Sequence, residues 1–178
     1  MTVQNFLFRL FLIGPLFLTG CSSINIEEYK DKSPELVLEE FFDGDLTAHG
    51  VVKDWSGKVI RHFNADIKAY WREGVGVLEE DFVFDDGEKQ RRVWTLTPDG
   101  SGNYIAEAND VVGPANALVS GNALFMQYVL RAPYKDGTID LTIDDRMYLV
   151  SPSVIVNESK MKKFGVSVGQ VLLTIVKK

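Results

Sequence analysis

Residues 63–72 read Phe-Asn-Ala-Asp-Ile-Lys-Ala-Tyr-Trp-Arg, and this stretch decides the fold more than any other part of the chain. Every second residue from Phe63 to Trp71 is apolar, and the residues between them are mostly polar. This period of two places all the apolar side chains on one face of an extended chain. The stretch therefore predicts a β-strand with one face buried and the other in solvent.

The same alternation returns in three further segments, at 78–85, 91–96 and 139–144. Turn-forming residues separate the alternating segments, at 54–57, 85–87, 98–102 and 135–137. An Asp-Gly pair between two alternating segments is a strong signal for a hairpin, because glycine readily adopts the positive φ that the turn needs. We expect about eight or nine strands in an antiparallel meander.

Two short helices are expected beside these strands. Residues 157–165 begin with an asparagine that can cap a helix, contain lysines near the end and finish on Gly165, and a last strand follows at 167–176. Residues 36–42 predict a second short helix before the first strand.

Long antiparallel strands avoid exposed edges by closing into a barrel. A barrel of about eight strands is filled by its own side chains or holds one small ligand. A late helix followed by one closing strand resembles the lipocalin layout. We therefore predict a mainly β fold, a single eight- to nine-stranded antiparallel lipocalin-like barrel with a short C-terminal helix before the last strand.

The N-terminus predicts a lipoprotein precursor. Residues 10–18 are apolar, a length typical of a secretory signal and too short to span a bilayer, which takes about 20 residues. Leu18-Thr19-Gly20-Cys21 closely resembles the bacterial lipobox. The resemblance implies a diacylglyceryl group on Cys21, cleavage before it and acylation of the new amine. In a Gram-negative host, Ser22 resembles a signal for sorting to the outer membrane, where the protein would face the periplasm.

These patterns divide the chain into three parts. Residues 1–20 form a signal peptide that is removed, residues 21–36 form the lipidated N-terminus and a polar tether, and residues 37–178 form the barrel. The membrane is thus an expected partner, reached through the lipid on Cys21.

Charge and composition exclude several functions. The chain has 178 residues and a net charge of −6, and Arg9 is the only charged residue among the first twenty. Removing them leaves 18 basic and 25 acidic residues, a net charge of −7, which argues against nucleic-acid binding. One cysteine permits no internal disulfide or Cys-based zinc site, and His49 and His62 form no motif. No cofactor or metal is expected.

The sequence carries no recognisable catalytic motif. The chain has no GxSxG elbow, no HExxH and no P-loop, and its lone cysteine is consumed by the lipid. We therefore expect that the protein is not an enzyme.

Arg92 is the most informative polar candidate. It shares a strand face with Trp94, so both point into the barrel if that face is the inner one. An arginine there is suited to bind a carboxylate or phosphate head group through two hydrogen bonds. Alternatively it forms an internal ion pair with Glu80 or Asp110, or stacks on an aromatic ring, because a lone buried charge is very costly. Asp110 itself is expected to cap a turn.

The aromatic and aliphatic side chains of the sequence can form either a packed core or a pocket for an acyl chain. Residues 123–130 are apolar on both faces, which fits a helix, a strand buried on both sides, or an outer face that meets a partner or membrane. Asp144 and Asp145 do not have the spacing of an EF-hand, and we expect a solvated acidic strand face there. The candidate ligand-binding residues are Arg92, Trp94, Trp71, Glu80, Phe82 and Tyr128.

Several segments resemble DUF3833, a family of uncharacterised bacterial lipoproteins. They are LEEFFDG (38–44), DDGE (85–88), RVW (92–94), ANDVVG (108–113), GNAL (121–124), DDRMY (144–148) and NESKMKKFG (157–165). The resemblance covers nearly the whole mature chain. It implies a membrane-anchored location and a lipid-related role, since genes of some members neighbour those of fatty-acid-modifying enzymes.

The leading functional hypothesis is therefore a non-enzymatic one, the binding or carriage of a hydrophobic, lipid-like molecule inside the barrel. The second is an envelope interaction protein, with a filled barrel that docks a protein partner. The third is an enzyme acting on a lipid through residues that the sequence does not identify.

Overall fold

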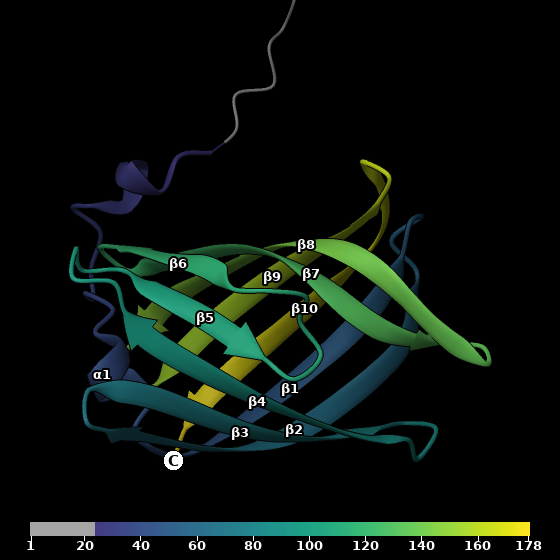
Figure 1. Cartoon of the computed structure of the whole chain (residues 1–178), viewed down its shortest axis with the longest axis horizontal. Helices are drawn as coiled ribbons and strands as arrows, with labels where there is room; N and C mark the ends of the chain where they lie inside the picture. Colours follow the sequence, from purple (N-terminus) through teal and green to yellow (C-terminus); the bar gives the residue numbers. More distant parts are fainter. Residues whose placement is uncertain (1–23) are drawn as a thin grey trace, which may run out of the picture.

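Ten antiparallel strands close into a barrel in the computed structural model, which describes residues 24–178 (Figure 1). The strands are β1 (Gly44–Asp54), β2 (Val59–Arg72), β3 (Val75–Phe84), β4 (Lys89–Pro98), β5 (Tyr104–Ala108), β6 (Ala115–Ser120), β7 (Ala123–Tyr134), β8 (Gly137–Ser151), β9 (Val154–Lys163) and β10 (Val166–Lys177). Each strand pairs with its neighbours in sequence, and β1 pairs with β10. The last pairing removes both free edges of the sheet.

A mainly β, single antiparallel barrel is confirmed, with ten strands in place of the eight or nine expected. The helix predicted at 157–165 is wrong, because those residues lie in β9 and in the turn that follows it. Ile155, Asn157, Ser159 and Met161 point into the barrel, so the period of two is present. Its inner face is half polar, which hides the strand from a search for alternating apolar residues.

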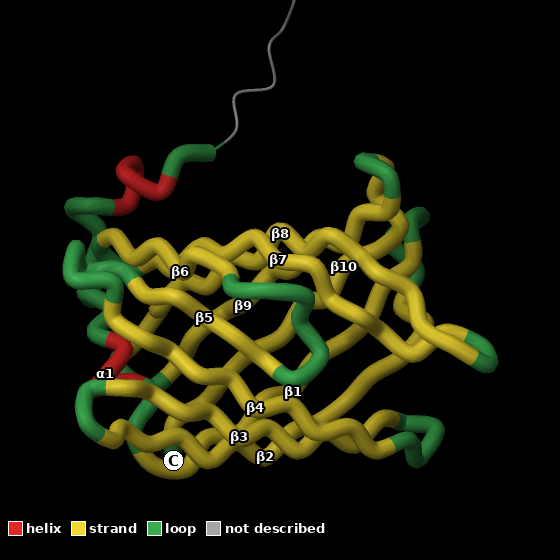
Figure 2. Tube along the Cα trace, in the orientation of Figure 1, coloured by secondary structure: helices red, strands yellow, loops and turns green. Residues whose placement is uncertain are grey.

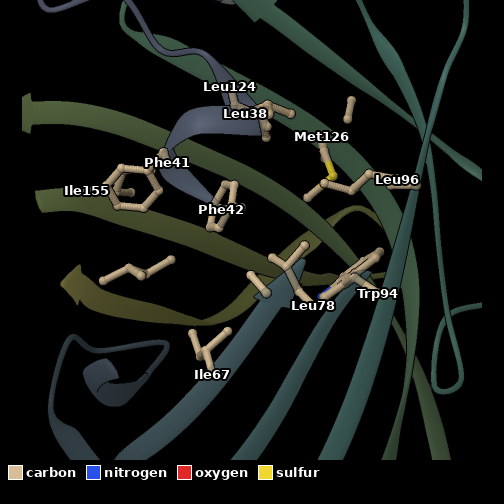
Figure 3. Packing of buried hydrophobic residues seen from close by; sticks show 14 of the residues in the cluster. Leu38, Phe41, Phe42, Ile67, Leu78, Trp94, Leu96, Leu124, Met126 and Ile155 are labelled. Atoms are coloured by element: carbon tan, nitrogen blue, oxygen red, sulfur yellow. The ribbon is translucent and has the colours of Figure 1, made fainter. Parts of the chain in front are cut away.

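A short helix closes one end of the barrel. Helix α1 (Leu38–Phe41) lies within the segment where a helix was predicted, beside the ends of the strands (Figure 2). Leu38, Phe41 and Phe42 are almost fully buried. They belong to the buried cluster inside the barrel, which also contains Leu124 and Ile155 (Figure 3). This apolar plug seals the end opposite the hairpins that join β3 to β4 and β7 to β8 (Figure 1).

Three polar contacts hold the plug in place. The indole Nε1 of Trp71 donates to the Phe42 carbonyl at 2.9 Å. The Tyr104 hydroxyl donates to Glu39 Oε1 at 2.6 Å. The ammonium group of Lys177 donates to a carbonyl of α1. Strands β2, β5 and β10 are therefore each tied to the segment that begins the barrel.

The N-terminal segment covers part of the barrel's outer wall. It contains a 3₁₀ helix, η1 (Ile26–Tyr29), whose Tyr29 ring lies 5.5 Å from that of Phe125 and 5.3 Å from that of Tyr148. This contact explains why residues 123–130 are apolar on both faces: the segment is strand β7, and the outward Phe125 is covered. Part of the expected tether thus packs on the barrel. The signal peptide and Cys21 lie outside the described residues.

Within residues 24–178, none of the helices has the length and apolar character needed to cross a bilayer.

Gly121 joins the N-terminal segment to the β6–β7 turn, and its replacement by alanine tests that junction. Gly121 has a φ of +52°, its carbonyl accepts from the Leu36 amide at 2.8 Å, and an added Cβ would overlap the Tyr29 carbonyl. We expect Gly121→Ala to lower the free energy of unfolding by about 1–3 kcal/mol, and to speed proteolysis of residues 24–36. Chemical denaturation and limited digestion measure both effects.

Gly137→Ala is the matched control, because Gly137 has an ordinary φ and open space around its Cα. Equal stability of the two variants would contradict the proposed packing of the N-terminal segment.

Candidate functional site

A cavity of about 260 Å³ lies inside the barrel. Side chains from β1 to β4 and from β7 to β10 line it, and most of them are apolar. Its wall includes Val52, Phe84 and Ala132, which lie near the hairpins at the end opposite α1. The cavity therefore occupies the part of the barrel that the apolar plug does not fill.

Arg92 on β4 is held by an ion pair inside this cavity. Its Nε donates to both carboxylate oxygens of Asp110, at 2.9 and 3.0 Å, and its Nη2 donates to Asp110 Oδ2 at 2.8 Å. The guanidinium also lies 5.6 Å from the Phe82 ring and 5.9 Å from the Trp94 ring. Of the alternatives predicted for Arg92, the structure shows the internal ion pair, with Asp110, together with contacts to aromatic rings. The expectation that Asp110 caps a turn is wrong, because its carboxylate turns inward to meet Arg92.

Glu80 on β3 lies directly opposite Arg92 in the strand register. Its side chain lines the cavity, the residue is 9% exposed, and no hydrogen-bond partner for its carboxyl is present within residues 24–178. Burial raises the pKa of Glu80 to about 7, because Arg92 offsets only part of the cost of removing the charge from water. Glu80 is thus a buried acid that changes charge near neutral pH.

Asp145 on β8 is a second buried acid, and it is fully supplied with donors. It is 4% exposed and accepts from Asn157 Nδ2, from Ser159 Oγ at 2.8 Å and from the Tyr128 hydroxyl at 3.4 Å. Burial raises the pKa of Asp145 above its usual value, against the opposing effect of these hydrogen bonds. The solvated acidic face predicted here is therefore wrong for Asp145.

Sequence reasoning missed three members of this site, Asp145, Asn157 and Ser159. A signal for Asp145 was present, because it shares the inner face of its strand with Ile143 and Met147. Asn157 and Ser159 give no comparable signal, because the inner face of β9 is half polar and its pattern therefore predicts a helix.

Five of the six predicted ligand-binding residues line the cavity together. They are Arg92, Trp94, Glu80, Phe82 and Tyr128. The rings of Trp94 and Tyr128 meet edge to face, with centroids 5.3 Å apart. Trp71 does not join them, because it lies at the plugged end and binds the α1 segment through its indole N–H. Within the described residues, no group of three His, Cys, Asp or Glu side chains is arranged to hold a metal ion.

These features define a class, closed antiparallel barrels with a mostly apolar internal cavity and a polar cluster in its wall. The sequence matches the family model described as "Protein of unknown function (DUF3833)" over residues 15–177, and the chain belongs to this family. No protein among the curated sequences matches it.

The barrel is similar in fold to a solved phycobiliprotein lyase. The S-type phycobiliprotein lyase CPES from Guillardia theta is similar with a TM-score of 0.50 at 16% identity, covering 87% of this chain and 98% of that one. A de novo designed fluorescence-activating β-barrel gives a TM-score of 0.42 at 11% identity, covering 80% of this chain and 99% of the design. At these identities the likeness concerns the fold alone.

The raised pKa of Glu80 makes stability depend on pH. Below its unfolded-state pKa of 4.5 the group is protonated in both states. As pH rises to about 7, the unfolded chain loses this proton while the folded chain keeps it, so stability falls. We expect Glu80→Gln to be more stable than the wild type at pH 8 by up to about 3 kcal/mol, with the difference vanishing toward pH 4.5.

Chemical denaturation across this pH range measures the effect. Glu107→Gln is the control, because it makes the same substitution at an exposed position. A Glu80→Gln variant that is less stable than the wild type at pH 8 would show that the carboxylate is well compensated in the folded state.

Proposed function

We propose that this protein is a lipoprotein anchored through Cys21, in the outer membrane and facing the periplasm, that binds a small hydrophobic, lipid-like molecule inside its barrel. The internal cavity is the observation that carries the proposal. Its 260 Å³ lies just below the range of about 300–1,000 Å³ common for ligand pockets. Its wall is mostly apolar, with a few converging polar groups, as such pockets usually are.

The cavity weakens one of the two other hypotheses, and its buried acid supports the other. A filled barrel that docks a protein partner is less well supported, since the interior is not filled. An enzyme gains support from Glu80, because an acid with a pKa of about 7 can both donate and accept a proton at neutral pH. Acid–base chemistry on the bound molecule is thus a second candidate function.

Blocking the cavity tests the binding function. Ala132 lines the cavity near the hairpin end and is only half-buried, so a tryptophan there would occupy space that a ligand needs. We expect protein purified from bacterial envelopes to carry a small molecule that native mass spectrometry detects, and Ala132→Trp to lose it. Thr138→Trp is the control, because Thr138 is exposed and does not line the cavity.

An unliganded mass, together with no binding of the neutral apolar dye N-phenyl-1-naphthylamine, would overturn the binding function. Extraction of the bound molecule before and after incubation separates the second candidate. A chemically altered molecule in the wild type, but not in Glu80→Gln, would favour the enzyme.

Membrane anchoring is tested at Cys21. Replacing Cys21 by alanine removes the thiol on which the diacylglyceryl group would be built. We expect Cys21→Ala to lose incorporation of labelled palmitate, because the acyl chains supply the membrane affinity. Cell fractionation and labelling measure this, with Ser23→Ala as the control, and equal labelling of both variants would reject the lipoprotein assignment.

A further inference from the structure

The charges inside the cavity are unequal. Glu80, Asp110 and Asp145 place three carboxyl groups in the wall, against two guanidinium groups, of which Arg61 lies on the hairpin side and only Arg92 lies in the same cluster. That guanidinium is already engaged through Nε and Nη2 by Asp110. A bound carboxylate or phosphate would add another negative charge in a region of low dielectric, where like charges repel strongly. The cluster therefore disfavours an anionic head group.

Among the three carboxyl groups, Glu80 is the one that lacks a partner within the described residues. Asp110 has Arg92, and Asp145 has donors from Asn157 and Ser159, but the carboxyl of Glu80 faces the cavity without a donor from residues 24–178. A buried carboxylate without a donor is costly, so a ligand that brings a donor or a positive charge to this point gains more than one that brings an acceptor.

Aromatic side chains line the cavity wall near Glu80, and two of them, Phe82 and Trp94, already have the Arg92 guanidinium 5.6 and 5.9 Å from their rings. Phe82 and Trp94 lie on the inner faces of β3 and β4, and Tyr128 packs edge to face against Trp94. The negative faces of aromatic rings attract cations, and a ring cluster beside a carboxylate is a favourable setting for an ammonium group. The apolar remainder of the cavity suits a hydrocarbon body.

We infer that the molecule bound in the barrel is a hydrophobic amine, with its basic nitrogen at Glu80 and its apolar part among the aromatic and aliphatic side chains. This inference rests on the proposed binding function and adds the chemical class of the ligand. It also makes binding depend on pH, because the ammonium group needs Glu80 in its charged form.

The charged and titratable groups that face Glu80 can be named strand by strand. Arg92 faces it from β4, Asp110 from the turn after β5, Tyr128 from β7 and Asp145 from β8. The cavity-lining residues of β1, β9 and β10 include no titratable side chain.

Strand β2 contributes one charge, Arg61, on the hairpin side of the cavity. Its Nε is buried without a hydrogen-bond partner within the described residues, but Asp86 and Glu88 bind its Nη2 at 2.8 and 3.0 Å and compensate its charge. Among the carboxyl groups of the wall, Glu80 therefore remains the one without a partner, and a ligand's charge would be felt through it.

Three decyl compounds that differ only in their head groups test the inference. Decylamine, decan-1-ol and decanoate would be titrated, below the concentrations at which they self-associate, against wild-type protein loaded with N-phenyl-1-naphthylamine. At pH 8 we expect decylamine to bind at least about tenfold more tightly than decanoate, since only the amine offsets the carboxylates. From pH 8 to pH 6 decylamine should weaken about tenfold, because the ionised fraction of Glu80 falls from about nine-tenths to about one-tenth.

Glu80→Gln should weaken decylamine about tenfold at pH 8 and remove the pH dependence, while decan-1-ol binds as before. Glu107→Gln should behave as the wild type, because its carboxylate is on the outer surface. The pH series on the wild type tests whether an amine binds at Glu80 even if Glu80→Gln fails to fold.

The outcomes separate the two proposals. Decanoate binding as tightly as decylamine, or dye binding with no displacement by the amine, overturns the amine and leaves the binding function in place. Failure of the dye and of all three decyl compounds to bind overturns both.

Discussion

Pairing between β1 and β10 is the constraint on which the rest of the structure depends. From Leu46 with Lys177 to Asp54 with Gly169, it joins the two ends of the sheet and leaves no open edge. Closure fixes an inner and an outer face for every strand. Because a barrel of about eight strands is just filled by its own side chains, a ten-stranded barrel encloses more space than its strands fill. Both the plug and the cavity follow from that surplus.

The interior space that the strands do not fill is divided unequally along the barrel. At one end Phe41 and Phe42 fill it, and Trp71 and Tyr104 fix the plug through hydrogen bonds to its carbonyl and carboxylate oxygens. Toward the hairpin end no segment of residues 24–178 enters in this way, and the inner wall carries buried acids in place of further apolar side chains. The same sheet therefore provides stability at one end and a binding space at the other.

Sequence patterns predicted which face of a strand a residue occupies better than they predicted its height along the barrel axis. Alternation placed Glu80, Arg92 and Trp94 on inner faces, as observed, and it placed Trp71 there too. Only pairing between strands sets the height of a residue along the barrel axis, so the position of Trp71 at the plug was not predictable. The Arg92–Asp110 pair likewise depends on the register of β4 against β5. Strand β9 was missed because its inner face is half polar.

The polar cluster also links ligand binding to folding. Asp145 receives donors from the neighbouring strand, whereas Glu80 receives none from residues 24–178, so the barrel bears the cost of burying that carboxyl. A ligand that supplies the missing donor binds only the folded state and stabilises it in proportion to its occupancy. At pH values well below 7, where Glu80 takes up a proton, the cost disappears together with the attraction for a cation. The same carboxyl thus sets both the stability of the empty barrel and its preference among head groups.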